Sequence, residues 1–416
     1  MFRSSVIGLV GALALTGPVA AAPKTTAPGA NVGELIALAR QLSPELAAAA
    51  LNAEAAIARI TSAGALPDPT LRIGTDNLDQ RNVSMNGRTT IYRLMQEFPL
   101  WGKLDLKRDI ASFEAAAAQY RRRSAELELV ARVKSVFAAR YATFQALTLT
   151  RQTLDTVSTA TANVRDRYSQ GNAAQEDVLR LEIEAEELNI EIARLRGQAV
   201  KTAAQLNALL SRRPDAPLAR PAALRPVPSE KKMRVGSLVD RAVRLNPSIA
   251  EGEAKAGSAS ATRQLAERNR YPDVSLGAMA TQDRDGYAGA GVMAEVRVPL
   301  QWGAKEAEVS AATAEQAAAE QRLRTLKAAL QGEVAGMVAE FGAAAKTLGI
   351  LQQHHLPKSE LVVRSTLSAL ETGQGDAFKV LDAIRRLRMV QLEILKLRVQ
   401  LQATLAEIEK AVGEDL

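Results

Sequence analysis

Apolar residues recur every three or four positions over most of the chain, which is the spacing of one face of an α-helix. From about 102 to 168 this stripe includes Val130 and Phe137, and near the end of the chain another stripe runs from Leu381 to Ile408. At 1.5 Å per residue, the first stretch would extend for about 100 Å as one helix. The pattern therefore predicts a protein built mainly from long helices.

Breaks in the helical pattern are few and fall at glycine or proline. Gly171 ends the first long stretch, and a second helix is expected from about 174 to 210. Gly373 holds the matching position later in the chain. Pro357 falls inside another long helix, where the missing N–H and the ring predict a kink or a break.

Four short segments alternate apolar and polar residues instead, which is the two-residue period of a β-strand. In the last of them Val292 and Val296 share one face, whereas Glu295 and Arg297 share the other. We expect strands at about 69–77, 89–99, 273–282 and 289–299.

Strands of about ten residues with one apolar and one polar face are typical of membrane barrels with a wet lumen. Two soluble hairpins packed on helices would show the same alternation, so both interpretations stay open. Four strands are too few to close a barrel, because known barrels begin at about eight. If these strands span a membrane, several copies of the chain must pool them.

An internal repeat is the most informative feature of the sequence. Four landmarks recur in the same order about 200 residues later, which chance similarity between alanine-rich helices does not explain. We predict a first repeat at 31–210, a proline-rich linker at 211–232 and a second repeat at 233–412. The matched landmarks are Leu42-Ser43-Pro44 with Leu245-Asn246-Pro247, Pro67-Asp68 with Pro272-Asp273, Pro99-Leu100-Trp101-Gly102 with Pro299-Leu300-Gln301-Trp302-Gly303, and Gly171 to Leu179 with Gly373 to Leu381.

The first residues have the build of a secretory signal peptide. A basic start at Arg3 precedes an apolar run from Val6 to Leu15 and small residues through Ala22. Cleavage after Ala21 gives a signal peptide of 1–21, since cleavage one residue later would leave proline first. The apolar run is shorter than the ~20 residues that span a bilayer, and we expect no transmembrane helix elsewhere.

Composition narrows the class of protein further. Aromatic residues make up only 4% of the 416 residues and alanine is abundant, which suits closely packed helices. The 53 basic and 46 acidic residues are interleaved, so the net charge of +7 predicts solvated helix faces and no nucleic-acid binding. Cysteine is absent, which excludes disulfides, thiolate metal sites and cysteine nucleophiles. We find no catalytic constellation and expect neither an enzyme nor a cofactor.

The order of elements, the paired landmarks and the Gly–Val-Leu turns resemble the TolC family of outer-membrane factors over roughly 31–412. The segments 66–69 and 97–103 are most similar to the heavy-metal efflux branch, the CzcC-like proteins. Export of drugs or other small molecules through the same channel stays open, as does a soluble periplasmic coiled-coil adaptor or scaffold.

The resemblance implies a homotrimer in which three chains with four strands each form a twelve-stranded transmembrane β-barrel standing on an α-helical barrel. It implies an outer-membrane channel in contact with lipid, and two partners, a periplasmic adaptor and an inner-membrane pump of the RND type. The helical part would project into the periplasm.

The resemblance also implies a periplasmic aperture where the helices turn. It carries an aperture aspartate onto Asp382 and places Lys379 where relatives can have a second aspartate, so a doubled acidic ring is not expected. Asp177 is the counterpart in the first half. A carboxylate ring attracts cations at a pore, although an acidic residue at a helix start can simply complement the helix dipole.

The apolar residues beside the turns are candidates for docking an adaptor hairpin. The alternative is that they begin the buried stripes of their helices. Charged neighbours in sequence, Glu176, Arg180, Arg385 and Arg386, are candidates for ion pairs that close the tip. The candidate docking residues are Gly171, Val178, Leu179, Gly373, Val380 and Leu381.

Two further groups could contact metal. His354 and His355 are adjacent, so on a helix they point about 100° apart and do not chelate one ion, and a role at the kink is the alternative. Thioethers suit soft Cu(I), but methionine is also ordinary lipid-facing filling. The methionines in or beside the strands are Met85, Met95, Met279 and Met293.

Overall fold

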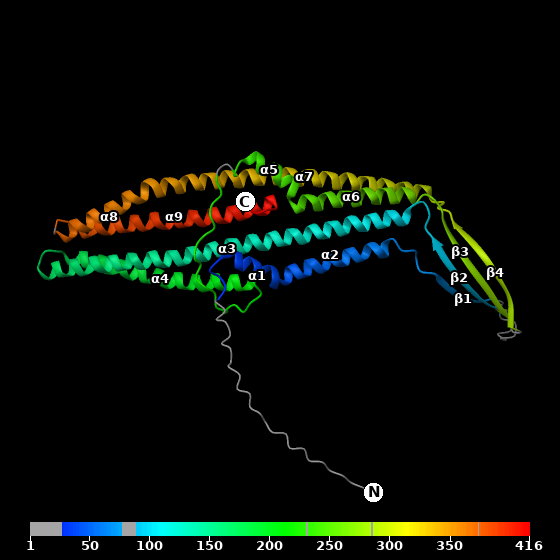
Figure 1. Ribbon diagram of the computed structural model, residues 1–416, viewed down its shortest axis with the longest axis horizontal. Helices are drawn as coiled ribbons and strands as arrows, with labels where there is room; N and C mark the ends of the chain where they lie inside the picture. The colour runs from blue at the N-terminus through cyan, green and yellow to red at the C-terminus, as the bar shows by residue number, and fades with distance from the viewer. Residues whose placement is uncertain (1–26, 77–88, 230–231, 284–285, 373) are drawn as a thin grey trace, which may run out of the picture.

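The computed structural model of the protein describes residues 27–76, 89–229, 232–283, 286–372 and 374–416. The expected signal peptide, Met85 and Gly373 lie outside these residues. The described part is an elongated bundle of helices with a small sheet at one end and two helix turns at the other (Figure 1). The prediction of a mainly helical chain with four strands is therefore confirmed.

The elements follow one another in the same order in both halves of the chain. The first half contains α1 (Val32–Leu42), α2 (Pro44–Ala63), β1 (Thr70–Asp76), β2 (Thr89–Phe98), α3 (Lys103–Ser169) and α4 (Gln175–Leu209). The second contains α5 (Val235–Leu245), α6 (Pro247–Arg268), β3 (Asp273–Asp283), β4 (Gly286–Arg297), α7 (Trp302–Ile350), the π-helical turn η1 (Leu351–His355), α8 (Leu356–Glu371) and α9 (Ala377–Val412).

The first repeated landmark is a helix break built in the same way twice. Ser43 ends α1 and caps α2, where its hydroxyl accepts a hydrogen bond from the Leu46 amide at 3.4 Å. Asn246 does the same between α5 and α6, accepting from the Ser248 amide at 2.7 Å. In each case the following proline occupies the first helical turn, where its missing N–H costs nothing.

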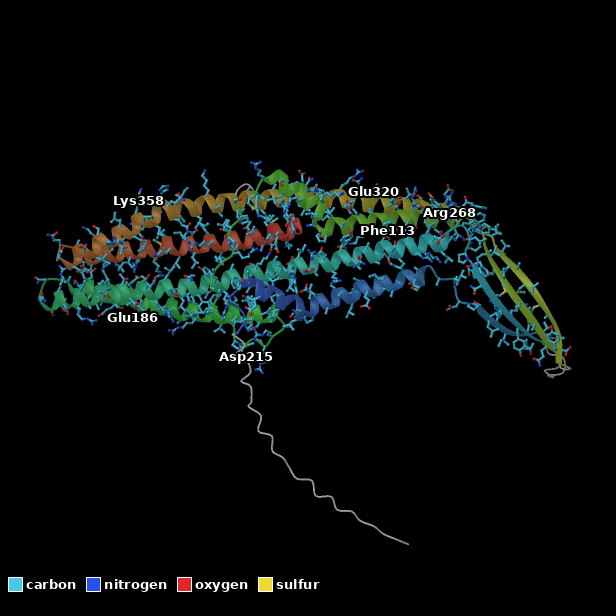
Figure 2. The ribbon with its side chains drawn as sticks, viewed as in Figure 1. Phe113, Glu186, Asp215, Arg268, Glu320 and Lys358 are labelled. Atoms are coloured by element: carbon cyan, nitrogen blue, oxygen red, sulfur yellow. The ribbon has the colours of Figure 1, made fainter. Side chains whose placement is uncertain are left out.

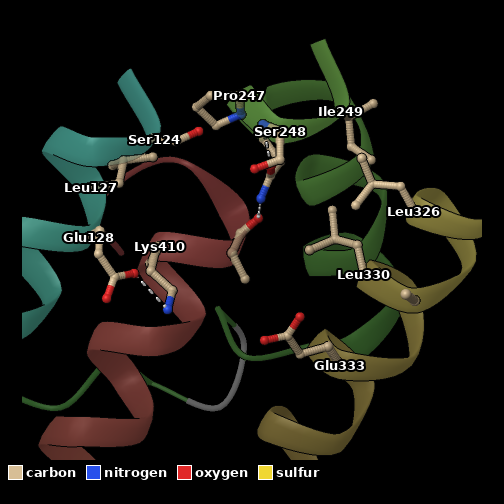
Figure 3. Close-up of a pocket in the computed structure, with 13 residues that line it drawn as sticks. Ser124, Leu127, Glu128, Pro247, Ser248, Ile249, Leu326, Leu330, Glu333 and Lys410 are labelled. Carbon is tan, nitrogen blue, oxygen red and sulfur yellow. Dashed lines mark hydrogen bonds and ion pairs between the residues drawn. The ribbon is translucent and has the colours of Figure 1, made fainter. Parts of the chain in front are cut away.

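Figure 3 shows where the second of these breaks packs against the end of α9. The Asn246 side chain donates to the carbonyl oxygen of Ala411 at 2.7 Å and is buried. A pocket of about 300 Å³ beside it is lined in part by Lys410 and Glu128, which form an ion pair at 3.1 Å. Burial lowers the pKa of Lys410, but hydrogen bonds with Glu407 and Glu128 outweigh it, so the net shift is upward. These bonds tie α6, α9 and α3 together.

The helices share small apolar cores rather than one large core. One core joins α5, α6, α7 and α9, a second joins α1, α3 and α4, and a third fills the tip. Phe113 of α3 lies against Gly257 of α6 so closely that a Cβ at Gly257 would approach the ring to 2.6 Å. Charged side chains such as Glu186 and Lys358 project outward from the bundle (Figure 2).

Within the described residues, one helix is long and apolar enough to cross a membrane by length and composition alone, which the sequence pattern did not lead us to expect. The stretch Trp302–Glu371 meets the criteria of length and composition, and 22% of its apolar window is buried. Several small residues are exposed along this part of α7, and small residues suit close packing against another helix. They are Gly332, Gly336, Ala339, Gly342 and Ala343, and the charged Glu340 and Lys346 are exposed beside them.

Pro357 distorts its helix without ending it. The five residues that directly precede α8, Leu351–His355, form a π-helical turn. Pro357 lies in the first turn of α8. The wider turn accommodates a proline that lacks an N–H for the helical ladder. His354 and His355 lie in this turn and are exposed. Within the described residues, no group of three His, Asp or Glu side chains is placed to hold a metal ion.

A buried ionic cluster joins the two halves and the linker in the middle of the bundle. Lys134 of α3, which is 4% exposed, binds Glu409 of α9 at 2.7 Å, and Arg225 of the linker binds the same carboxylate at 3.0 Å. Asp415 also contacts Lys134. Burial raises the pKa of Asp415, but the bond to Lys134 outweighs it and holds the pKa below its ordinary value. Gln402 donates to the Arg225 carbonyl oxygen at 2.8 Å, so the linker is fixed at this point.

We expect Glu409→Ala to lower the free energy of unfolding by about 3–5 kcal/mol, because it takes the shared carboxylate away from the buried Lys134 and the part-buried Arg225. The matched control is Glu393→Ala, which removes only a surface ion pair with Lys396 at 3.4 Å and should cost less than about 1 kcal/mol. Denaturant unfolding of the purified protein in detergent, followed by circular dichroism, measures both. Equal costs for the two variants would contradict this role.

Candidate functional sites at the helical tip and the sheet

The turn between α3 and α4 depends on glycine at one position. Gly171 has a φ of +75°, and nothing lies within 4 Å of a Cβ built on it, so the backbone and not space requires glycine. The turn closes with hydrogen bonds from the Gly171 amide to the Tyr168 carbonyl at 3.0 Å and from the Asn172 amide to the Arg167 carbonyl at 2.8 Å. This is a Schellman-type end that reverses the chain in a few residues.

The turn between α8 and α9 uses a different glycine, which the sequence analysis missed. A Cβ on Gly375 would lie 2.4 Å from the Leu370 amide nitrogen, so the backbones approach too closely for any other residue. Asp376 then caps α9 by accepting from the Phe378 amide at 2.9 Å. The signal for Gly375 was its place immediately before a capping aspartate. Gly373, the predicted counterpart of Gly171, lies outside the described residues.

Three of the four apolar residues expected at the exposed tip are buried. Val178, Val380 and Leu381 belong to the tip core with Leu370, and only Leu179 is exposed, at 48%. They start the buried stripes of α4 and α9, because the two hairpins must cover each other where they meet. Of the two alternatives that the sequence left open, these three residues thus follow the buried stripe, whereas Leu179 is exposed.

The candidate aperture residues differ in their surroundings. Asp382 is half-exposed and pairs with Arg386 one turn later, at 2.8 Å. Asp177 is half-buried at the start of α4, and Lys379 is exposed on α9. A single chain therefore leaves the Asp382 carboxylate open to solvent but partly neutralised by Arg386.

The remaining tip charges hold the two hairpins together. Arg385 of α9 binds Glu184 of α4 at 2.5 Å, and the Glu184 side chain is only 2% exposed. Arg388 approaches the same carboxylate at 3.8 Å. Sequence reasoning missed Glu184, although it is an acidic residue on the apolar stripe between Leu181 and Leu188. A buried carboxylate in such a position requires a cation from a neighbouring helix.

Arg180 and Glu176, both suggested as tip partners by sequence, pair with each other within α4. The hydrogen bond to Glu176 is the main cause that raises the pKa of Arg180. Its guanidinium also lies 5.9 Å from the ring centre of Phe378, an exposed residue of α9. Arg180 thus connects the two hairpins at the surface, whereas the half-exposed Arg385 connects them through the buried carboxylate of Glu184.

The sheet at the opposite end has the order β1-β2-β3-β4, and all its pairs are antiparallel. Because side chains alternate along each strand, the register divides the sheet into two faces. Val292, which is 93% exposed, lies on a face that is mostly apolar and has no charged residue among the paired positions of the described strands. We call this the apolar face. Its larger members are Leu71, Ile73, Tyr92, Leu94, Phe98, Val274, Leu276, Val292 and Val296.

The opposite face, which we call the polar face, carries the charged residues and the methionines. Met95 and Met293 lie on either side of Gly277, and a Cβ on Gly277 would reach the Met95 sulfur at 2.2 Å. Met279 is on the same face, above Gly291. The three described methionines of the strands therefore lie on the polar face, opposite the face that carries Val292.

Two landmarks from different halves bind each other where the sheet meets the helices. Lys103, at the start of α3, reaches both carboxylate oxygens of Asp273 at 2.8 Å and the Tyr271 carbonyl at 2.9 Å. The Trp101 indole donates to the Pro272 carbonyl at 2.8 Å, and its ring lies 5.2 Å from that of Tyr271. Sequence analysis found these segments as repeats but not as a contact.

The sequence matches the family model described as outer membrane efflux protein over residues 35–212 and again over 238–414. The chain belongs to this family. Members of the outer membrane efflux protein family are transport channels and not enzymes, which agrees with the sequence prediction. Among curated proteins, none matches the sequence.

Solved structures of outer-membrane proteins share the fold at low sequence identity. The outer-membrane channel OprN has a TM-score of 0.79 and 18% identity, with 92% of this chain and 89% of that chain covered. The outer membrane protein VceC of Vibrio cholerae has a TM-score of 0.79 and 19% identity, with 92% and 96% covered. CusC, described for its transmembrane channel formation, has a TM-score of 0.78 and 17% identity, with 92% covered on both sides.

We expect Gly171→Ala to destabilise the α3–α4 turn by about 1–2 kcal/mol, because a Cβ is unfavourable at positive φ. The matched control is Gly197→Ala in the middle of α4, where the added methyl meets nothing within 4 Å. That substitution should stabilise by up to about 1 kcal/mol, since alanine favours helix over glycine. Amide hydrogen exchange of the α3–α4 turn is measured in both variants, and we expect faster exchange in Gly171→Ala only. Equal protection of the turn in the two variants would contradict the prediction.

Proposed function

We infer that the protein is the outer-membrane channel of a tripartite efflux system and passively conducts its substrate to the exterior. The observation that carries this proposal is the exposed apolar face of the sheet, at the far end of the bundle from the helix turns (Figure 1). A face with Val292, Ile73 and Leu71 open to solvent is stable only against lipid or another apolar surface. A periplasmic adaptor, the alternative function, has no need of such a face.

The proposed channel is a homotrimer. Four strands with two free edges are too few for a barrel, and three chains supply twelve. The small exposed residues of α7, such as Gly332 and Gly336, suit lateral packing of helices from neighbouring chains into a hollow α-helical barrel. In this arrangement the sheet lies in the outer membrane and the helices project into the periplasm.

The helix turns form the proposed periplasmic aperture. Three copies of Asp382 near the symmetry axis would form a cation-attracting ring, with Asp177 and Lys379 nearby. The resting aperture is nearly closed, held by ties such as Arg385–Glu184, and a periplasmic adaptor opens it. Around Gly171 and Gly373, adaptor hairpins would grip the exposed Leu179 and Phe378. An inner-membrane pump of the RND type would supply the substrate.

Heavy-metal cations are the proposed cargo. A carboxylate ring favours cations over neutral drugs. The sequence of residues 97–103 is most similar to that of the heavy-metal efflux branch of the family. The methionines of the polar face would present thioethers to the lumen, which soft cations prefer. Drug or other small-molecule export by the same channel is the alternative, and ion selectivity distinguishes the two.

We expect Val292→Arg or Val296→Arg to impair assembly in the outer membrane, because arginine at mid-depth on the lipid side costs roughly 2–4 kcal/mol. Arg297→Ala is the control, since it removes only an exposed ion pair with Glu97 at 3.2 Å. The measurement is the yield of detergent-extracted trimer from outer membranes, by native mass. Equal yields would reject the assigned faces, and a fully soluble or monomeric mature protein would reject the channel.

We expect Asp382→Ala to reduce the cation preference of the channel, and Lys379→Asp to increase it, because each changes the charge at the aperture. Arg385→Ala should raise the resting conductance by releasing Glu184. Asp215→Ala, on the linker far from the tip (Figure 2), is the control and should change neither property. Reversal potentials and conductance in planar bilayers measure these effects. If the tip variants behave like the control, the aperture is elsewhere.

A further inference from the structure

The sheet leaves two edges that the described part of the chain does not pair. β2 and β3 are central, whereas β1 and β4 each have one neighbour. Each free edge presents a row of unpaired N–H and C=O groups. Both edges belong to a sheet whose apolar face is exposed, so neither is shielded by the helices (Figure 1).

The repeat provides a template for closing these edges, because β2 and β3 already form a contact between the two halves. Along the chain, Pro99 before α3 corresponds to Pro299 before α7, an offset of 200 residues. Asp68 before β1 corresponds to Asp273 at β3, an offset of 205 residues. The pair β4–β1 is therefore the counterpart of the pair β2–β3.

Transferring the register of β2–β3 gives a specific alignment. Leu94 of β2 lies opposite Ala278 of β3. Moving 200 residues forward from Leu94 reaches Ala294, and moving 205 residues back from Ala278 reaches Ile73. We propose that β4 of one copy pairs antiparallel with β1 of a second copy with Ala294 opposite Ile73, and we call this contact the seam. The proposal rests on the trimeric channel proposed above.

The faces of the sheet agree with this register. Ala294 and Ile73 both lie on the apolar face, as do the next pair along the seam, Val296 and Leu71. A slip by one residue would bring the apolar face of one copy onto the polar face of the next. The two offsets come from separate landmarks, so this agreement is an independent check.

Charge gives a second check on the polar face. In the proposed register Glu295 of one copy lies opposite Arg72 of the next. Within the chain Arg72 lies opposite Arg93, a like-charge pair that is unfavourable, and the described residues supply no ion pair to either Arg72 or Glu295. A slip by two residues would put Glu295 opposite Thr70 or Gly74 and leave both charges unmatched.

Side-chain size gives a third check. The register places Met293 opposite Gly74 of the second copy, and no atom lies within 4 Å of a Cβ built on Gly74. Inside the chain Met293 already lies opposite Gly277 on its other side. Large and small residues would thus alternate across the seam as they do within the sheet.

Cysteine cross-linking tests the register directly, because the chain has no cysteine of its own. Leu71→Cys with Val296→Cys probes the apolar face, and Gly74→Cys with Met293→Cys probes the polar face. The two pairs are of opposite hydrogen-bonding type, so one is of the closer kind. The shifted controls combine Leu71→Cys with Ala294→Cys or with Val298→Cys, whose Cβ atoms would be about 7–8 Å apart and too far for a disulfide.

Purified protein in detergent is oxidised and run on denaturing gels without reductant. We expect linked dimers and trimers as the main species for at least one pair in register, and several-fold less linkage for both shifted pairs. Stronger linkage in a shifted pair, with a trimeric native mass, overturns the register and leaves the channel standing. A monomeric native mass with no linkage overturns both.

Charge reversal provides a second readout. Glu295→Arg should reduce the yield of trimer, since it faces Arg72 across the seam, and adding Arg72→Glu should restore the yield. Arg297→Glu, also on the polar face of β4, is the control that Arg72→Glu should not rescue, because the register places position 297 opposite Thr70. Equal rescue of both variants, or of neither, overturns the proposed pairing of Glu295 with Arg72.

Discussion

A four-stranded antiparallel sheet leaves hydrogen-bonding groups unpaired at its two outer strands and leaves its apolar face uncovered. This constraint accounts for much of the rest of the molecule. β1 and β4 leave backbone groups unpaired, and Val292 and its neighbours expose an apolar surface that water does not favour. A closed ring of strands in lipid, as in the proposed channel, would solve both problems. The chain by itself would be one segment of such a ring.

The helical body meets a related constraint, because its long helices share no single central core. Packing relies instead on several separate apolar cores and on a few ionic contacts that are at least partly buried. Lys103–Asp273 fixes the sheet to the helices, Lys134–Glu409 fixes the middle and Arg385–Glu184 fixes the tip. Each contact joins the first half of the chain to the second. Together they set the register between the halves along the whole length of the bundle.

Much of this fold could be predicted from the sequence, because periodicity reports which face of an element is buried. The helical and strand segments and the apolar face containing Val292 follow directly from spacing. Contacts between residues that lie far apart in the sequence cannot be predicted from spacing in this way. Glu184, Gly375 and the contact of Trp101 with Tyr271 depend on which helices and loops meet, and a single sequence contains that information only indirectly. The sequence left the burial of Val178 and Val380 open for the same reason, since whether a stripe is covered depends on a neighbouring helix.

The repeat explains why a contact inside the chain can inform a contact between chains. The two halves of one chain pair through β2 and β3. Their counterparts in the repeat, β4 and β1, each keep one edge without a partner strand in the described sheet. A ring in which every junction has nearly the same geometry must use the internal junction and the external one in alternation. Sequence differences between the halves are then expected where the β2–β3 junction within a chain differs from the proposed β4–β1 junction between chains. In the proposed trimer, the additional Gln301 and Ala304 of the second half would lie beside the junction between chains, at the start of α7. The charges follow the same logic, because Arg72 faces Arg93 within the chain and needs an acidic residue on its other side.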